Sequence, residues 1–148
     1  MKLKTLRTVL QLTRLKADQS AVSAQQARAR FEEARSFSDQ VQAYAQEYDQ
    51  GYAKVASVGD SAMLLQERSQ FNANLRKTAR EQKEQVKPLE KKAGTAIAQA
   101  MEHHARAQAM ERFLHARKQK MAELADLREA KEAEDVLQAR VAKSQGGL

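Results

Sequence analysis

The sequence has no cysteine and no tryptophan, and it contains only one proline, five glycines, four phenylalanines and three tyrosines in 148 residues. Without cysteine, the chain can form neither a disulfide nor a thiolate nucleophile, and the usual structural zinc sites are excluded. Because helix-breaking residues and large aromatic side chains are both scarce, the composition favours long helices with a thin core over a compact globule.

Long apolar runs are also missing. No segment approaches the roughly 18 consecutive apolar residues that a membrane-spanning helix needs. The opening MKLKTLRTVLQLTRLK is interrupted by charge too often to be the apolar core of a signal peptide. These features predict a cytoplasmic protein.

Residue patterns that carry catalysis or hold a cofactor are not apparent. The stretch KKAGTAIA at 91–98 lacks the second glycine and the lysine placement of a phosphate-binding loop. His103 and His104 are adjacent and therefore point about 100° apart on a helix, and His115 stands alone, so no shared set of metal ligands is predicted. We expect no catalytic residue, no metal and no cofactor, and hence a protein that is not an enzyme.

What the sequence does contain is helix-forming residues and positive charge. Hydrophobic residues, many of them alanine, make up 42% of the chain, and the formal net charge is +7. Such a charge predicts contact with an acidic partner, which charge alone leaves open as nucleic acid, phospholipid or an acidic protein surface. The aromatic interleaving and basic-zipper layouts of nucleic-acid-binding proteins are missing, so we expect no nucleic-acid partner.

Apolar and small residues recur at alternating steps of three and four along the first third of the chain. Thirteen of sixteen such positions are apolar; the positions are 3, 6, 10, 13, 17, 20, 24, 27, 31, 34, 38, 41, 45, 48, 52 and 55. A repeat that averages 3.5 residues keeps one stripe against a partner helix, so this spacing predicts one strand of a left-handed coiled coil.

A second and longer helical run follows a predicted reversal. Gly59 permits the reversal, and either Asp60 or Ser61 is a suitable N-cap for the next helix. The stripe of the second run then takes in Leu64, Arg68, Phe71, Leu75, Thr78, Gln82 and Val86. Two successive steps of four between 78 and 86 shift its phase, and we expect a kink beside the following Pro88.

The predicted fold is all-α, with two long helices forming an antiparallel coiled-coil hairpin and an overhanging second helix. A single coiled-coil domain covers 1–148, with the first helix at about 2–52, a turn at about 53–60, the second helix at about 61–142 and a disordered tail at 143–148. With the reversal centred near residue 56, Val41 faces Phe71, and residues beyond about 112 have no partner in the first helix.

Two surfaces of the predicted hairpin are candidates for binding a partner, one at its open end and one near its turn. Basic residues gather at the open end, where Glu111 is the only acidic residue between 105 and 120. Residues 1–16 carry five basic residues and no acid, which fits an anionic membrane surface, an acidic protein or simply a solvated coiled-coil end. Near the turn, Phe37 and Tyr44 lie one position off the stripe, where they either cover the seam or leave an apolar flank for a partner.

Several short stretches are similar, in order and spacing, to one known family. They are Y-A-Q-E-Y at 44–48, the glycine-containing turn, the stretch from Gln70 to Leu75, L-x-x-R-K from Leu114 to Lys118, and E-D at 134–135. Together they resemble the FliJ family, the small coiled-coil component of the flagellar type III export apparatus, over essentially the whole chain.

The resemblance implies an antiparallel two-helix coiled coil similar to the γ subunit of rotary ATPases. Its open end would insert into the hexameric export ATPase and stimulate ATP hydrolysis. The residues that we assign to this contact are Lys2, Lys4, Arg7, Arg106, Arg112, Leu114, Arg117, Lys118 and Lys120.

The resemblance also implies contact with the cytoplasmic region of the export gate membrane protein, and with export chaperones. The gate-binding positions fall on Phe37, Val41, Tyr44, Tyr48, Phe71, Leu75, Thr78 and Gln82. Of these, Phe37, Thr78 and Gln82 differ in type from the residues that the family has there. The protein would then work in the cytoplasm at the inner face of the cell membrane, with a weak peripheral membrane contact.

The alternative is a structural or chaperone-type coiled coil without an ATPase partner. A stalk of a virulence type III secretion system is similar in shape and belongs with this alternative.

Overall fold

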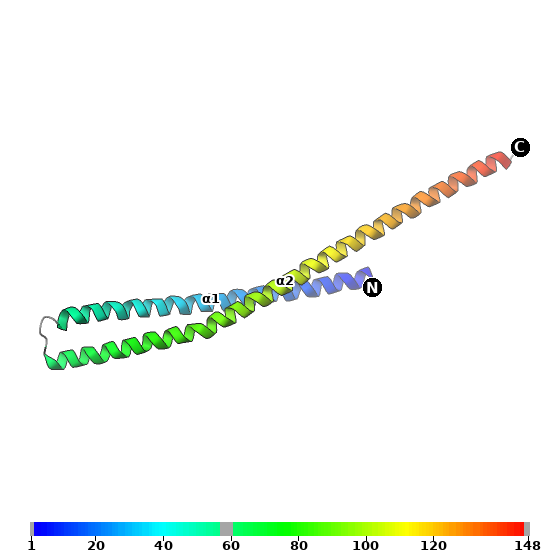
Figure 1. Cartoon of the computed structure of the whole chain (residues 1–148). Coiled ribbons are helices and arrows are strands. Elements are labelled where there is room, and N and C mark those ends of the chain that lie inside the picture. The colour runs from blue at the N-terminus through cyan, green and yellow to red at the C-terminus, as the bar shows by residue number, and fades with distance from the viewer. Residues whose placement is uncertain (1, 57–60, 147–148) are drawn as a thin grey trace. The chain divides into compact units, whose positions relative to one another are not determined.

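The computed structural model describes residues 2–56 and 61–146, which form two long helices and, within those ranges, no strand. Helix α1 spans Leu3–Ala56 and helix α2 spans Ala62–Gly146 (Figure 1). The two helices pack against each other, so the predicted all-α helical hairpin is confirmed.

Both helices run past their expected ends. Helix α1 ends at Ala56 rather than at about 52, and α2 ends at Gly146 rather than at about 142. Residues 143–146 of the expected disordered tail are therefore helical; they include no proline, and Lys143 in the last turn lies favourably at the negative end of the helix dipole. Residues 57–60 of the expected turn, and 147–148 of the expected tail, lie outside the described residues.

Ser61 caps the start of α2. The backbone N–H of Leu64 donates a hydrogen bond to Ser61 Oγ at 3.3 Å, and the N–H of Leu65 donates to the Ser61 carbonyl at 3.1 Å. Such a cap satisfies a backbone donor that has no partner within the helix and stabilises it by about 1 kcal/mol. Asp60, the other residue expected as a cap, lies outside the described residues.

The least exposed residues of α1 reproduce the predicted stripe. From Leu3 to Tyr48, every predicted position is buried or half-buried. The last two predicted positions, Tyr52 and Val55, have side chains outside the described part of the structure. This stripe is the face of α1 that packs against α2.

The stripe of α2 differs from the prediction. Its buried and half-buried residues keep alternating steps of three and four without a phase shift, at 65, 68, 72, 75, 79, 82, 86, 89, 93, 96, 100, 103, 107, 110, 114 and 117. The predicted phase shift was wrong because it took the large Phe71 and the β-branched Thr78 as seam residues, whereas the structure buries the smaller Asn72 and Ala79. Helix α2 continues across Pro88, whose side chain is exposed and lies off the seam.

Contacts divide the chain into two compact units. The terminal unit contains Met1–Leu15 and His104–Leu148, and the middle unit contains Lys16–His103. Each unit contains a segment of both helices. That residues 1–148 act as a single coiled-coil domain stays a prediction.

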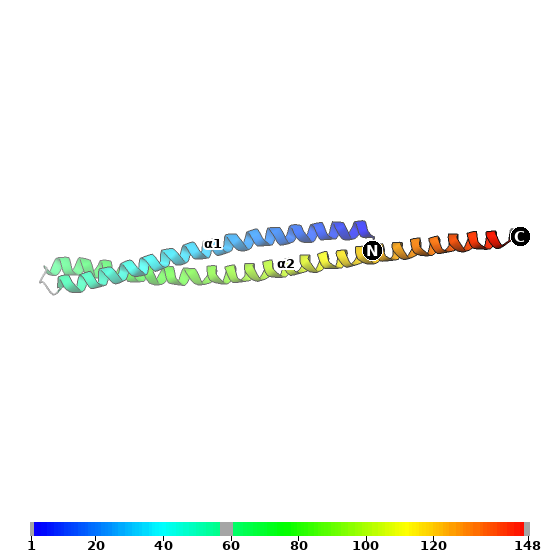
Figure 2. The ribbon, with the colours of Figure 1, turned by 90° about the horizontal axis from the view of Figure 1, so that it is seen from above.

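The middle unit has a seam of small residues, and its two helix segments lie side by side in both views (Figure 2). Among the described residues of this unit, the buried apolar ones are alanines, namely Ala17, Ala24, Ala45, Ala79 and Ala93, and the buried polar ones are Ser38 and Asn72. Small side chains permit close approach of the helices but bury little apolar area, at about 25 cal/mol per Å². The core of this unit is therefore thin.

The register of the middle unit is shifted by one heptad from the prediction. Phe71 contacts Tyr48, with ring centroids 4.8 Å apart, rather than Val41 seven residues earlier. The reason is that α1 extends to Ala56 and α2 begins only at Ala62, which centres the reversal nearer to residue 59 than to residue 56.

The terminal unit contains a cluster of larger apolar side chains. Leu6, Leu10 and Leu114 are buried together, and Leu3 and Met110 pack against them. Beyond Arg117, every described residue of α2, from 118 to 146, is exposed. We call residues 118–146 the overhang; the expected overhang is present, but it begins about five residues later than predicted.

Candidate functional site

The predicted gate-binding residues form a surface of the middle unit that we call the aromatic flank. It is contributed by both helices and consists of Phe37, Val41, Tyr44, Tyr48, Phe71, Leu75, Thr78 and Gln82. Phe37 and Tyr44 are each 52% exposed and Phe71 is 47% exposed, whereas Val41, Tyr48, Leu75 and Gln82 are half-buried. Three large apolar side chains are thus left open to solvent along one side of the seam.

An aromatic pair ties the flank together across the two helices. The rings of Tyr48 and Phe71 meet edge-to-face, with an interplanar angle of 65°. Such pairs stabilise by about 0.5–1.5 kcal/mol beyond the area that they bury. Thr78 contributes no free hydroxyl donor, because its Oγ1 donates to the Asn74 carbonyl at 3.0 Å.

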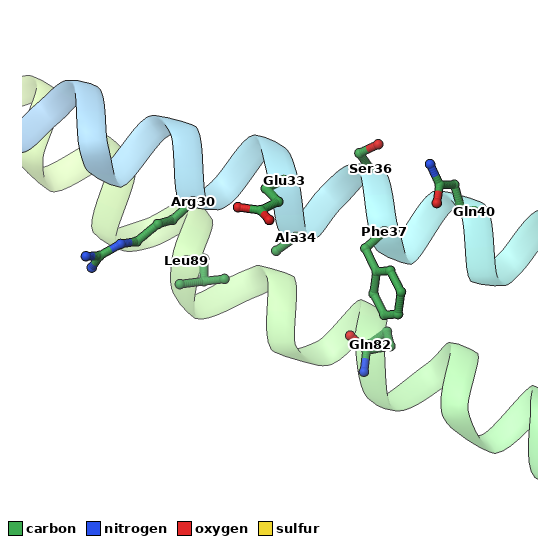
Figure 3. A pocket seen from close by; sticks show the side chains of 8 residues that line it. All are labelled: Arg30, Glu33, Ala34, Ser36, Phe37, Gln40, Gln82 and Leu89. Atoms are coloured by element: carbon green, nitrogen blue, oxygen red, sulfur yellow. The ribbon is translucent and has the colours of Figure 1, made fainter.

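A groove of about 640 Å³ continues the flank toward the middle of the unit. Its apolar walls are Phe37 and Ala34 of α1 and Leu89 of α2; its polar lining consists of Arg30, Glu33, Ser36, Gln40 and Gln82. Figure 3 shows the Phe37 ring reaching from α1 toward Gln82, with Leu89 close to Ala34 (Figure 3). Sequence reasoning missed this groove, because only the register between the helices brings Leu89 next to α1.

A polar cluster lies next to the Tyr48–Phe71 pair of the aromatic flank, at Asp49, Asn72 and Arg76. The carboxylate of Asp49 accepts a hydrogen bond from Asn72 Nδ2 at 2.7 Å and forms an ion pair with Arg76. Hydrogen bonds from Arg76 and Asn72 hold the pKa of Asp49 below its ordinary value of 3.8. The amide oxygen of Asn72, Oδ1, is buried and accepts no hydrogen bond from the protein.

Sequence reasoning missed this polar cluster as well. The available signal was Asn72 itself, because a polar residue at a seam position commonly fixes the register of two helices. The signal was hidden when Phe71 was placed in the seam instead.

The predicted ATPase-binding residues lie in the terminal unit. Lys2, Lys4, Arg7, Arg106, Arg112, Lys118 and Lys120 are exposed, and Arg117 is half-buried. Leu114 differs from the others: it is only 6% exposed and packs against Leu6 and Leu10, so its side chain is not presented to a partner. The structure assigns Leu114 to the core of the unit.

The basic character of this unit is concentrated. Residues 2–15 and 104–120 carry nine basic residues and a single acidic one, Glu111. Glu111 is itself paired, because Arg14 Nε donates to its Oε1 at 2.6 Å. We call this part of the terminal unit the basic end, and an acidic partner is the counterpart that its charge favours.

Within 2–56 and 61–146, no group of three or more histidine, cysteine or acidic side chains is arranged to hold a metal ion. In the same ranges, neither helix has a stretch that is long and apolar enough to cross a membrane. The aromatic flank and the basic end have the apolar anchors and the concentrated charge that are typical of protein-binding surfaces.

Comparison with known families decides the class of protein. The family described as "Flagellar FliJ protein" matches residues 1–146. The chain belongs to the FliJ family. It is therefore a component of the flagellar protein export apparatus, from a family that is structural and non-catalytic. No curated protein and no solved structure matches the chain.

Membership in the FliJ family agrees with the resemblance noted in the sequence and gives the two surfaces a context. Both the aromatic flank and the basic end belong to a protein that interacts with other parts of the export machinery. The surfaces lie in different units, and each has its own chemistry, apolar in one and cationic in the other.

Proposed function

We propose that the chain is a non-catalytic stalk that binds the hexameric export ATPase and stimulates its ATP hydrolysis, while also contacting the export gate. The observation that carries the proposal is the family match over residues 1–146. The stalk role is consistent with a chain built from two long helices and with side chains suited to binding in both units.

The ATPase contact is proposed for the basic end. Exposed members of the predicted set such as Lys2, Lys4 and Arg7 favour acidic side chains of the ring, since nine basic residues there accompany a single, paired acid. Complementary charge mainly raises the association rate and selects the partner. Leu114 supports this surface from beneath by holding α1 and α2 together.

The gate contact is proposed for the aromatic flank. Half-exposed aromatic side chains are the type that anchors protein interfaces, because each contributes a large contact area at a low cost in conformational entropy. Phe37, Tyr44 and Phe71 provide three such anchors. Binding of export chaperones, and a location in the cytoplasm at the inner face of the membrane with a weak peripheral membrane contact, complete the proposal.

The test is ATP hydrolysis by the ATPase of the same export system, measured with and without the full-length chain. We expect stimulation by the wild type, and a loss of most of it when Lys2, Lys4 and Arg7 are replaced by Glu. The matched control replaces the exposed Lys77, Arg80 and Lys83 of the middle unit by Glu, which changes the net charge equally. Absence of stimulation and of co-purification with the wild type would rule out the ATPase role.

The gate contact has a separate test. We expect Phe37→Ala and Tyr44→Ala to weaken binding to the purified cytoplasmic region of the gate protein, whereas Val22→Ala, which also truncates a half-exposed apolar side chain, leaves binding unchanged. Equal effects of all three substitutions would remove the aromatic flank from the interface.

A further inference from the structure

One side of α2 in the terminal unit combines apolar and basic side chains at coiled-coil spacing. The positions follow alternating steps of four and three, and they are Phe113, Arg117, Lys120, Leu124, Leu127 and Lys131. We call them the 113–131 stripe. It is distinct from the seam that faces α1, with which it shares only Arg117.

The apolar members of the stripe are uncovered. Phe113 is 54% exposed, Leu124 49% and Leu127 66%. Lys120 and Lys131 are exposed as well, because no residue of the overhang is buried. Leu124 and Leu127 are neighbours on one face of the helix, and both are exposed to solvent. An exposed apolar patch of this kind marks a surface for a partner.

The charges within the stripe are of one sign. The stripe contains three basic residues and no acidic one; Asp126 and Glu129 lie on the opposite side of the helix together with Lys118, and Glu123 lies beside the stripe, three residues after Lys120. The stripe is about 27 Å long at 1.5 Å per residue, which is enough for five turns of a partner helix.

We propose that the 113–131 stripe docks an acidic amphipathic helix of a partner protein. A repeat of 3.5 residues is the spacing that a packed helix recognises, and the interleaved basic residues select acidic positions on that helix. Phe113, Leu124 and Leu127 then pack against apolar residues that lie between the acidic positions of the partner helix. Phe113, Arg117 and Lys120 lie within the basic end, to which the ATPase contact is assigned, and Leu124, Leu127 and Lys131 extend the binding surface into the overhang.

Two other occupants fit the stripe less well. A parallel second copy of the chain would set Arg117, Lys120 and Lys131 against the same cations, and like charges at an interface are unfavourable. An antiparallel copy would set these cations against Leu127, Leu124 and Phe113, which leaves each charge without one of opposite sign. A lipid surface favours a broad apolar face with basic residues at its edges, whereas in the stripe the basic residues lie in line with Phe113, Leu124 and Leu127.

The experiment measures binding of the full-length chain to a synthetic 21-residue helical peptide by isothermal titration calorimetry. The peptide carries Leu opposite the three apolar positions and Glu opposite the three basic ones, and a matched peptide carries Lys in place of each Glu. We expect the wild type to bind the acidic peptide at least about tenfold more tightly than the basic one, and added salt to weaken the binding.

Matched variants locate the binding on the helix. Lys120→Glu and Leu124→Ser should each weaken binding of the acidic peptide about tenfold or more, from loss of a charge pair or of buried apolar area. Lys118→Glu and Leu137→Ser make the same chemical changes on other sides of α2 and should change it less than about twofold. All four positions are exposed, so circular dichroism should show wild-type helicity.

Three results would overturn the proposal. The first is failure of the acidic peptide to bind, or equal losses in the stripe and control variants. The second is a wild-type dimer in sedimentation that Lys120→Glu converts to monomer. The third is binding to vesicles of anionic lipid that the stripe variants abolish while peptide binding is absent. None of these depends on whether the ATPase is stimulated, so the proposed function is tested separately.

Discussion

The two units hold their helices together by different means. In the terminal unit, large leucines bury apolar area between α1 and α2, and Arg14 pairs with Glu111 beside them. Among the described residues of the middle unit, the buried apolar ones are alanines, and the side-chain contacts between α1 and α2 include the Tyr48–Phe71 ring pair and the hydrogen bond from Asn72 to Asp49. Burial of apolar area by leucines therefore holds the helices together in the terminal unit. In the middle unit, a few specific contacts between side chains contribute more.

The units differ equally in charge. Residues 1–15 and 104–148 contain 13 basic and 7 acidic residues, a net charge of +6, whereas residues 16–103 contain 13 and 12, a net charge of +1. Almost the whole charge of the chain thus belongs to one unit. The difference teaches that the cationic and the aromatic surfaces are separate, so substitutions can disable either one alone.

The largest expected effect is in the leucine cluster. Leu10→Ala should lower the free energy of unfolding by about 2–3 kcal/mol, because it removes a buried side chain and leaves a cavity. Leu12→Ala, two residues away at a side chain that is 57% exposed, should cost less than about 0.5 kcal/mol. Urea unfolding followed by circular dichroism measures both, and similar losses would contradict the assignment of Leu10 to the core.

The aromatic flank gives the next largest contrast, between two tyrosines. Tyr48→Ala should cost about 1–2 kcal/mol, because it removes the half-buried ring that meets Phe71. Tyr44→Ala and Phe37→Ala should leave helicity and melting nearly unchanged, since both rings lie off the seam. A large loss of stability in either of the latter variants would assign that ring to the core of the middle unit rather than to a partner.

The buried amide of Asn72 offers a gain in stability instead of a loss. Asn72→Leu should raise the free energy of unfolding by about 1 kcal/mol, because it replaces a polar group with an unpaired Oδ1 by an apolar side chain at a seam position. The control is Asn74→Leu, an exposed position on the same helix. Destabilisation by Asn72→Leu in thermal melts would show that the hydrogen bond to Asp49 outweighs the unpaired oxygen.

The smallest expected effect is the pH dependence from Asp49. Its pKa is lower in the folded chain than the ordinary value of 3.8, so its interactions stabilise the fold above that value and are lost as pH falls through the lowered pKa. Between about pH 5 and pH 2, the wild type should lose slightly more melting temperature than Asp49→Asn does. Equal losses in the two proteins would mean that the Arg76 ion pair contributes nothing measurable.

These contrasts also explain what the sequence could and could not predict. The stripe of α1 was predicted correctly because its residues are apolar or small at every step from Leu3 to Tyr48. The stripe of α2 was predicted incorrectly near residue 71. The large apolar Phe71 was expected in the seam, whereas the structure buries the smaller and polar Asn72. The choice between them follows from the register of the two helices, which a single sequence does not contain.

The candidate surfaces follow the same rule. The exposure of Phe37 and Tyr44 was predictable, because each lies one position off a correctly predicted stripe. The groove beside Leu89 and the cluster around Asp49 depend on pairs across α1 and α2, so they appeared only in three dimensions. Leu114 was expected at the ATPase contact because residues beyond about 112 were predicted to have no partner in the first helix, whereas it packs against Leu6 and Leu10 of α1.

The overhang has one further consequence. A helix without buried side chains is protected from solvent only by its own backbone hydrogen bonds, so its local opening requires little free energy and its amide protons exchange rapidly with deuterium. Amides around Leu6 and Leu10, held by packed neighbours, exchange far more slowly and provide an internal reference within the same unit. Deuterium uptake between 118 and 146 therefore reports whether a ligand is bound there, because binding protects the amides and lowers their uptake.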